Sequence, residues 1–518
     1  MGTDGDYFMD FNSLLLTLIV FAPVTAAVII FLTPKDKTLF VRIIAATATG
    51  LTLILSIVAF VLYDRAAGAA QYQFQGIAPW VPSLGISYHV GVDGIGLTMV
   101  LLTGIVGFMG VLISWNIKDR PREFFAFFML LVAGVFGVFV SLDLFLLIFF
   151  YELSIFPMYI LIATWGSTRK EYAAMKLTLY LLIGSIIALV GVLAVYFSAQ
   201  FPAGVLPEGA TRTFDLLLLQ QSNIPIEVQR IWFLPIFIGF GVLAGIWPFH
   251  NWSPDGHVAA PTAVSMIHAG VLMKLGAFAA IIAMRLLPDA AREQMPWVIL
   301  LVTVNVVYGA AIAMVQKDFK YVIGFSSVSH MGLVTMGFAT MNQVGLNGAV
   351  LQMWSHGIMT ACFFAVVGLI YDRAHTRQIN ELSGWARYFP LATVAFIIGG
   401  LVSMGMPGLS GFVAEFQIFM GLWQGPFFGQ IWYYPIIAIL AIWGVILTAA
   451  YVLRIVQQVF FGEWDPHKWH DLRPSNFGDK LALITFSVLM IVVGLAPALL
   501  LGTIELGTKP LLALLGGG

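Results

Sequence analysis

Apolar runs long enough to cross a lipid bilayer follow one another along almost the whole chain. A membrane-spanning helix needs about 20 mostly apolar residues. These runs are too long and too continuously apolar for the alternating strands of a membrane barrel. The pattern therefore predicts an all-α integral membrane protein with about 14 transmembrane helices. The predicted spans are 13–32, 40–63, 94–115, 123–140, 142–165, 173–199, 231–250, 262–284, 297–315, 321–340, 346–371, 389–421, 431–460 and 480–503.

Two of these spans are interrupted by proline and glycine. The segment GIWPFH (245–250) breaks the seventh span, and GMPGLSG (405–411) breaks the twelfth. Such breaks free backbone groups, which is tolerated only inside protein or beside a water-filled cavity. Because paired breaks are typical of transporter repeats, we expect two inverted five-helix repeats, helices 4–8 and 9–13, although proline kinks are also common in ordinary membrane helices. The predicted segments are 1–120, 121–285 for the first repeat, 296–460 for the second, and 461–518.

The basic residues predict how the helices are oriented. Of the 25 Lys and Arg, 17 fall in loops after odd-numbered helices and 5 in loops after even-numbered ones. By the positive-inside rule the odd loops are cytoplasmic and both termini face outward. The acidic start, residues 1–6, lacks the basic region of a signal peptide, so the first span is expected to be retained. The longest loops, 64–93 and 200–230, lie outside and are too short for a catalytic domain.

Composition excludes several classes of protein. Hydrophobic residues make up 60% of the 518 and charged residues 10%, against about 25% charged in a soluble chain, so a soluble multi-domain enzyme is excluded. The net charge of −1 offers no basic surface to nucleic acid. The single cysteine, Cys362, cannot supply the roughly four thiolates of an iron–sulfur cluster. His250 and His257 lack the Cys or carboxylate neighbours of a metal site, so we expect no metal, cofactor or redox centre in this chain.

Three charged residues fall in the middle of predicted spans, where a charge costs about 2.5–3.5 kcal/mol. Glu152 and Glu415, the latter just after the second break, would favour the protonated form away from water and could bind and release a proton. Lys274 is about twelve residues, roughly 18 Å, into its span, too deep to reach the interface. A purely structural ion pair is the alternative interpretation for Glu152.

Two histidines accompany these charges. His330 has Ser326 one turn away, an arrangement that suits a hydrated proton relay, and His356 lies in the next span; for both, a packing role is the alternative. Asp143 follows Ser141 at a predicted helix start, which favours a capping or an interface role, and Asp93 likewise begins a helix. The residues alone therefore predict a proton or cation translocator with a carboxylate–lysine–histidine–carboxylate path.

The chain also resembles a known family, the antiporter-like membrane subunits of respiratory complex I. The resemblance is closest to the M type, equivalent to mitochondrial subunit 4, because relatives of the L and N types are expected to carry lysine where this chain has Glu415. The segments that carry it are GVDGI (91–95), YELSIFPMY (151–159), AAMKLTLY (173–180), PFHNWSPDGH (248–257), APTA (260–263), KDFK (317–320), SSVSHMG (326–332), YDRAHTR (371–377) and MPGLSGFVAEF (406–416).

The resemblance implies a proton-pumping subunit of an NADH:quinone oxidoreductase in a bacterial inner membrane. It implies that partner subunits hold FMN, iron–sulfur clusters and quinone, and that sister L and N chains are neighbours. Carried over by motif, Glu152, Lys274 and Glu415 are the carboxylate, lysine and exit carboxylate of the path, with His330 and His356 on its central polar axis. In the implied mechanism a change in the Glu152–Lys274 interaction sends a proton through the histidines to Glu415.

The chain departs from the family pattern at one position. The lysine expected on the seventh helix is Leu243 here, and no lysine lies between 177 and 273. His268 falls where a leucine is usual in M-type chains. Three interpretations follow: His268 replaces the missing lysine near Glu152, Lys274 alone faces Glu152, or this copy pumps poorly and is largely structural.

Three other functions compete with the complex I assignment. The first is a secondary cation/proton antiporter subunit without a redox partner, against which Glu415 argues. The second is the equivalent subunit of a membrane-bound hydrogenase or another ferredoxin- or F420-linked complex. The third is a structural scaffold, for which Leu243 is the main support.

Overall fold

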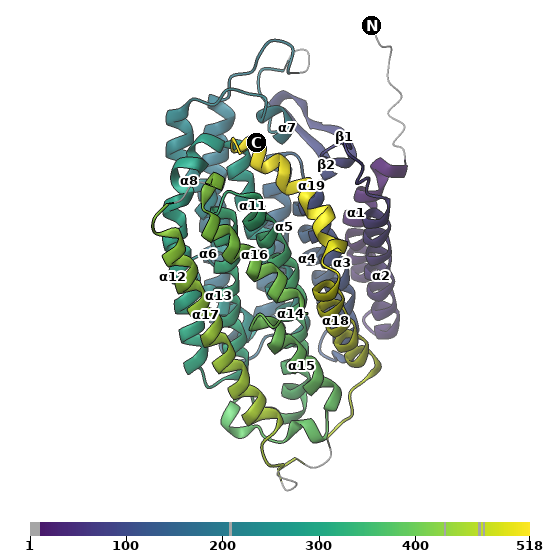
Figure 1. Ribbon diagram of the computed structural model, residues 1–518. Helices are drawn as coiled ribbons and strands as arrows, with labels where there is room; N and C mark the ends of the chain where they lie inside the picture. The colour runs from purple at the N-terminus through teal and green to yellow at the C-terminus, as the bar shows by residue number, and fades with distance from the viewer. Residues whose placement is uncertain (1–10, 207–209, 429–430, 465–467, 470–471, 518) are drawn as a thin grey trace.

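The computed structural model describes residues 11–206, 210–428, 431–464, 468–469 and 472–517. The acidic start, residues 1–6, lies outside the described residues, as does residue 518 at the other end. The predictions of a retained first helix and of outward-facing termini depend in part on these ends. The described chain is a bundle of long helices packed side by side (Figure 1).

The first half of the bundle begins with two long helices, a hairpin and three further long helices. Its elements are α1 (Phe11–Leu32), α2 (Thr38–Leu62), β1 (Gln73–Val81), β2 (Ile86–Val92), α3 (Gly94–Ile113), α4 (Pro121–Val140), α5 (Leu144–Trp165), α6 (Lys170–Ser198), α7 (Leu216–Leu219), α8 (Ile226–Ala244), α9 (Trp252–Ala259), α10 (Thr262–Ile267), a π-helical turn η3 (His268–Leu272) and α11 (Met273–Leu286).

The second half is helical throughout its described residues. Its elements are α12 (Pro288–Val315), α13 (Phe319–Ala339), α14 (Gln343–Ala374), α15 (Pro390–Ser403), α16 (Ser410–Gln424), α17 (Tyr434–Ile455), a π-helical turn η7 (Val456–Phe460), α18 (Phe477–Leu495) and α19 (Ala498–Leu514). Short 3₁₀ turns stand at 82–84, 114–116, 379–381, 385–387 and 426–428.

The all-helical membrane architecture is confirmed. Within the described residues, thirteen helices are long and apolar enough to cross a membrane, α10, η3 and α11 together forming one of them. The remaining predicted span, 389–421, is the short apolar helix α15 followed by α16. The inverted relation of the two five-helix repeats stays a prediction.

Both predicted breaks are present. The helix α8 ends at Ala244, where Gly245 adopts a φ of +76°, and α9 begins only at Trp252. Between α15 and α16 the chain passes through Gly405 at φ +66° and Gly408 at φ +92°. Side chains rarely tolerate this left-handed region, so glycine allows the chain to leave one half-helix and enter the next.

Two segments differ from the sequence prediction. The span predicted at 480–503 is two helices, because α18 ends at Leu495 and Pro497 precedes α19. The loop predicted at 64–93 contains the antiparallel hairpin of β1 and β2, which turns at Gly85 with a φ of +66°. The hairpin, α7 and the end of α19 gather at one end of the bundle (Figure 1).

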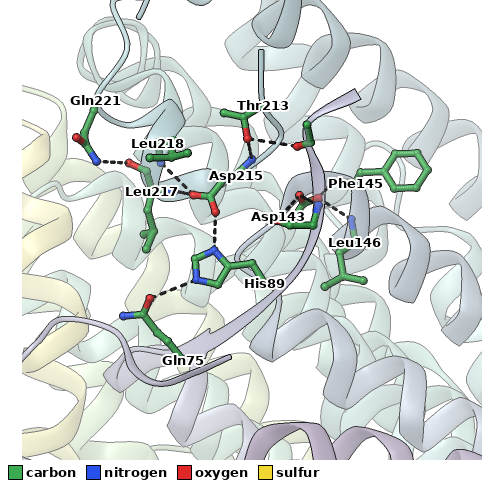
Figure 2. A network of polar contacts seen from close by, with 12 residues as sticks. Gln75, His89, Asp143, Phe145, Leu146, Thr213, Asp215, Leu217, Leu218 and Gln221 are labelled. Atoms are coloured by element: carbon green, nitrogen blue, oxygen red, sulfur yellow. Dashed lines mark hydrogen bonds and ion pairs between the residues drawn. The ribbon is translucent and has the colours of Figure 1, made fainter. Parts of the chain in front are cut away.

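A buried polar cluster fastens this hairpin to the loop that carries α7 (Figure 2). His89 on β2 lies with its Nδ1 2.5 Å from Oδ2 of Asp215 and its Nε2 3.2 Å from Oε1 of Gln75. Asp215 caps α7, and Asp143 caps α5 by accepting from the backbone N–H groups of residues 145 and 146. The predicted capping role of Asp143 is therefore confirmed, as is that of Asp93, which accepts from Gly96 at the start of α3.

Candidate functional site

Four of the sequence-predicted site residues meet in the centre of the bundle, although they come from four helices. Lys274 lies on α11, His356 on α14, His330 on α13 and Glu415 on α16, and all four side chains are buried. Their contacts form a chain of titratable groups from the first half of the bundle to the second.

Lys274 is oriented by the π-helical turn that precedes it. A π turn inserts one extra residue and commonly occurs at functional sites. The ammonium group donates to the backbone carbonyl of Ala269 within this turn and lies 2.7 Å from Nδ1 of His356. The closest titratable partner of the lysine is thus a histidine of the second half.

The two histidines continue the chain. The rings of His356 and His330 lie with their centroids 5.4 Å apart. His330 Nε2 lies 2.9 Å from the hydroxyl of Ser403, the last residue of α15 before the break. Its other nitrogen, Nδ1, faces Gln352 Nε2 at 3.3 Å. Both nitrogens therefore have polar neighbours, as a group that passes a proton between two sides requires.

Glu415 ends the chain beside the second break. Its Oε1 lies 3.4 Å from His330 Nδ1 and accepts a hydrogen bond of 3.3 Å from Gln352 Nε2. Its Oε2 lies close to Gly405, where an added Cβ would approach it to 2.9 Å. The broken backbone therefore makes room for the carboxylate.

Two residues of this site, Gln352 and Ser403, were missed by the sequence analysis. An amide and a hydroxyl in otherwise apolar helices were the only signal, and neither residue carries a charge that demands explanation. Ser326, predicted to accompany His330, instead shares a 2.7 Å hydrogen bond with the hydroxyl of Tyr451. The hydroxyl beside His330 comes from the broken helix, not from its own helix.

Glu152 stands apart from this chain. It is half-buried on α5, and the hydroxyl of Ser185 on α6 is its hydrogen-bonding neighbour. Within the described residues no ion pair joins Glu152 to Lys274, and its electrostatic neighbours do not include His268. The structure therefore does not bring together the expected carboxylate–lysine pair.

Leu243, at the position of the expected lysine, is a packing residue. It is fully buried on α8, and its backbone and Cβ lie against Gly276 on α11, where an added Cβ would approach to within 2.9 Å. The two helices approach closely at this point, and a side chain at 276 would collide with α8.

His268 lies in a second group of histidines instead of beside Glu152. Its ring stacks on Trp252 with centroids 5.2 Å apart and contacts the ring of His257 at 4.2 Å. Among the residues that the structure describes, neither ring nitrogen of His268 has a hydrogen-bond partner, and Nδ1 of His257 has none. Its predicted place next to Glu152 is corrected accordingly: the imidazole faces the broken half-helix α9.

The chemistry available to these groups is proton transfer. Lysine, imidazole and carboxyl groups each bind or release one proton, and hydrogen-bonded chains of them are typical of proton relays inside membranes. Within the described residues no group of three His, Cys, Asp or Glu side chains is arranged to hold a metal ion.

Comparison with known proteins adds an independent line of evidence. Residues 141–431 match the family described as "NADH:quinone oxidoreductase/Mrp antiporter, TM". NAD(P)H-quinone oxidoreductase chain 4 2 of Thermosynechococcus vestitus is 34% identical over 499 residues, 95% of this chain and 91% of the relative. NADH-quinone oxidoreductase subunit M of Rickettsia conorii is 32% identical over 507 residues, 96% and 98% of the two chains.

The fold also matches a solved structure. A chain of respiratory complex I from Thermus thermophilus, solved with bound NADH, superposes with a TM-score of 0.84 over 97% of this chain and all of the other. At 24% sequence identity this likeness concerns the fold.

Proposed function

The chain belongs to the antiporter-like membrane subunits of NADH:quinone oxidoreductase, of the M or chain 4 type, and from this premise we propose that it translocates protons along Lys274, His356, His330 and Glu415. The observation that carries the proposal is the buried series of contacts from the ammonium of Lys274 to the carboxylate of Glu415. Each step joins groups that can exchange a proton directly or through one water molecule.

The direction follows from the predicted orientation. Loops after odd-numbered spans are cytoplasmic, so protons would enter from that side, reach Lys274, and leave outward from Glu415 beside the second break. A carboxylate suits release, because its ordinary pKa of about 4 is far below that of lysine. We place the release step at the broken backbone around Gly405, because such breaks are tolerated only inside protein or beside a water-filled cavity.

The energy for this transfer would come from partner subunits. FMN, iron–sulfur clusters and quinone are assigned to those partners, with sister L and N chains as membrane neighbours in a bacterial inner membrane. Glu152 lies on α5 and is half-buried, in contrast to the fully buried Lys274. We propose that Glu152 responds to a charge change in a neighbouring subunit. Because no hydrogen bond or ion pair joins it to Lys274 within the described residues, its effect on Lys274 would be a long-range electrostatic one.

The competing antiporter function falls in the same family, whose description also names the Mrp antiporter. The 32–34% identity over more than nine-tenths of the relatives named above supports the quinone-linked complex. A tagged chain, gently extracted from its native membrane, separates the possibilities. Co-purified iron with NADH:quinone activity supports the proposal, whereas a complex without either, together with Na⁺/H⁺ exchange in vesicles, contradicts it.

The path itself is tested with the purified complex in sealed vesicles. Glu415→Gln keeps the size of the side chain but cannot release a proton, so pumped protons per NADH oxidised should fall. Glu505→Gln is the matched control, because Glu505 forms a surface ion pair with Lys509 on α19 and is not part of the path. Equal pumping by the two variants would refute the assignment of Glu415.

A further inference from the structure

A cavity opens at the predicted cytoplasmic end of the bundle. Its volume is about 190 Å³, which accommodates several water molecules. Its lining residues lie at helix ends beside the loops that follow odd-numbered predicted spans. The cavity therefore faces the side from which protons would enter. Its polar lining residues include Ser114, Ser167, Thr262, Lys320, Asp372 and Arg377.

Lys320 is the cation of this cavity that lacks an acidic partner. It is 6% exposed, and its ammonium donates a 2.6 Å hydrogen bond to the carbonyl of Ala260. Within the described chain no carboxylate lies within 4.0 Å of it, whereas Arg377 pairs with Asp318 at 3.3 Å. A buried lysine held only by a carbonyl and bordering water can lose and regain its proton.

The same contact ties Lys320 to the half-helix α9. The last carbonyls of a helix have no partner within the helix and carry partial negative charge. Here Ala260 accepts from Lys320, Val258 from Arg377 at 2.9 Å, and Ala259 from the N–H of Ser167 at 2.8 Å. Lys320 is therefore fixed to the half-helix that carries His257.

Beyond Lys320 the structure offers the next acceptors. The ring of Phe364 contacts both the ammonium of Lys320, 5.9 Å from its centroid, and the ring of His257, 5.6 Å away. His257 touches His268, and these two rings hold three nitrogens without a hydrogen-bond partner. His257 also lies within electrostatic range of Lys274, where the path described above begins.

We propose that Lys320 takes up protons from the water of this cavity and passes them through His268 and His257 to Lys274. In the first transfer an N–H bond of the Lys320 ammonium breaks and one forms on an imidazole nitrogen of His268. That proton next leaves His268 for the Nδ1 of His257, and then leaves His257 for the neutral amine of Lys274, while the Lys320 amine regains a proton from cavity water. The inference rests on the proposed proton translocation and extends it to the uptake side of the same path.

Three variants of the complete complex in sealed vesicles test this assignment. Lys320→Met removes the charge, and Lys320→Arg keeps the charge that caps α9 but cannot release a proton near neutral pH. Lys317→Arg, three residues away and exposed, is the matched control. Assembly is checked on native gels, and NADH oxidation with an artificial acceptor checks the partner subunits.

Both Lys320 variants should lose as much of the pumped protons per NADH as Glu415→Gln, while Lys317→Arg pumps like the unmodified complex. Full pumping by Lys320→Arg would overturn the uptake role and leave only a capping role. If Lys320→Arg does not assemble, Lys320→His, which is smaller and still titratable, replaces it. It should pump measurably better than Lys320→Met, and equal failure of the two would also overturn the proposal.

Glu415→Gln separates this inference from the function on which it rests. If Glu415→Gln pumps normally, proton translocation along the whole path is wrong. If Glu415→Gln loses pumping while Lys320→Arg retains it, the path stands and only its proposed uptake residue is wrong.

Discussion

The buried ion pair between Asp93 and Arg285 makes a quantitative prediction about stability. Asp93 caps α3 through Gly96 N–H at 2.8 Å and binds the guanidinium of Arg285, from the last turn of α11. The two side chains are 1% and 2% exposed. Removing one partner of such a pair costs about 3–5 kcal/mol, because the other charge stays buried without compensation.

Tyr72 cannot take over as the missing counter-charge. Its hydroxyl accepts a 2.8 Å hydrogen bond from Arg285, and burial raises the pKa of Tyr72 to about 12. The phenol therefore stays neutral at pH 7. Asp93→Asn, which keeps the capping oxygen, should lose the full 3–5 kcal/mol, and Asp93→Ala should lose about 1 kcal/mol more with the cap.

The assay is irreversible thermal inactivation of the detergent-solubilised complex. If the whole loss appears in the unfolding rate, 3–5 kcal/mol corresponds to unfolding roughly 10²- to 10⁴-fold faster. The double variant Asp93→Asn with Arg285→Met removes both charges, so it should be more stable than either single variant alone. A double variant whose loss equals the sum of the two single losses would show that the charges are not coupled and would refute the reasoning.

Three further outcomes test the polar path. Lys274→Arg should stop pumping while the complex still assembles, because a permanent cation keeps His356 from accepting a proton. Two positive charges 2.7 Å apart repel by about 6 kcal/mol at an effective dielectric constant of 20. A variant that pumps normally would contradict this. His268→Leu should abolish coupled pumping without affecting assembly, measured on native gels, since its ring nitrogens make no hydrogen bond that the leucine would remove; unchanged pumping would contradict the role. Gly405→Ala should lower pumping because the new Cβ would lie 2.9 Å from Glu415. Gly408→Ala, with a positive φ as well and no atom within 4 Å of its added Cβ, reports the backbone strain alone. Equal losses of pumping in the two variants would exclude the carboxylate contact.

The features that the sequence predicted correctly are those with a local physical cause. Proline and glycine inside apolar runs identified both broken helices, since backbone freedom and a missing N–H act within a few residues. Asp93 and Asp143 were recognised as caps because a carboxylate just before an apolar run satisfies the free N–H groups of the first turn. The burial of Lys274 and Glu415 followed from their places in the middle of apolar spans, whereas their roles stay a proposal.

The features that the sequence did not reveal depend on packing between distant segments. Lys274 was expected to face Glu152, but the π-helical turn before it directs the ammonium toward His356, 82 residues later. The bridging Gln352 and Ser403 become visible only when α13, α14 and α15 are packed together. The hairpin gave no clear alternating pattern, because its strands are half-covered on both faces.

The substitution of Leu243 for a lysine is understandable from the same energetics. A lysine there would be a second buried cation on a helix that packs directly against α11, the helix of Lys274. An imidazole carries the proton at lower cost, because with an ordinary pKa of about 6.5 it is mostly neutral at pH 7 and need not be buried as a charge. His257 and His268 can therefore occupy this depth without a carboxylate, provided that the cation which feeds them sits where water reaches it. Lys320, at the edge of the cavity that lies at the predicted cytoplasmic end, meets that condition.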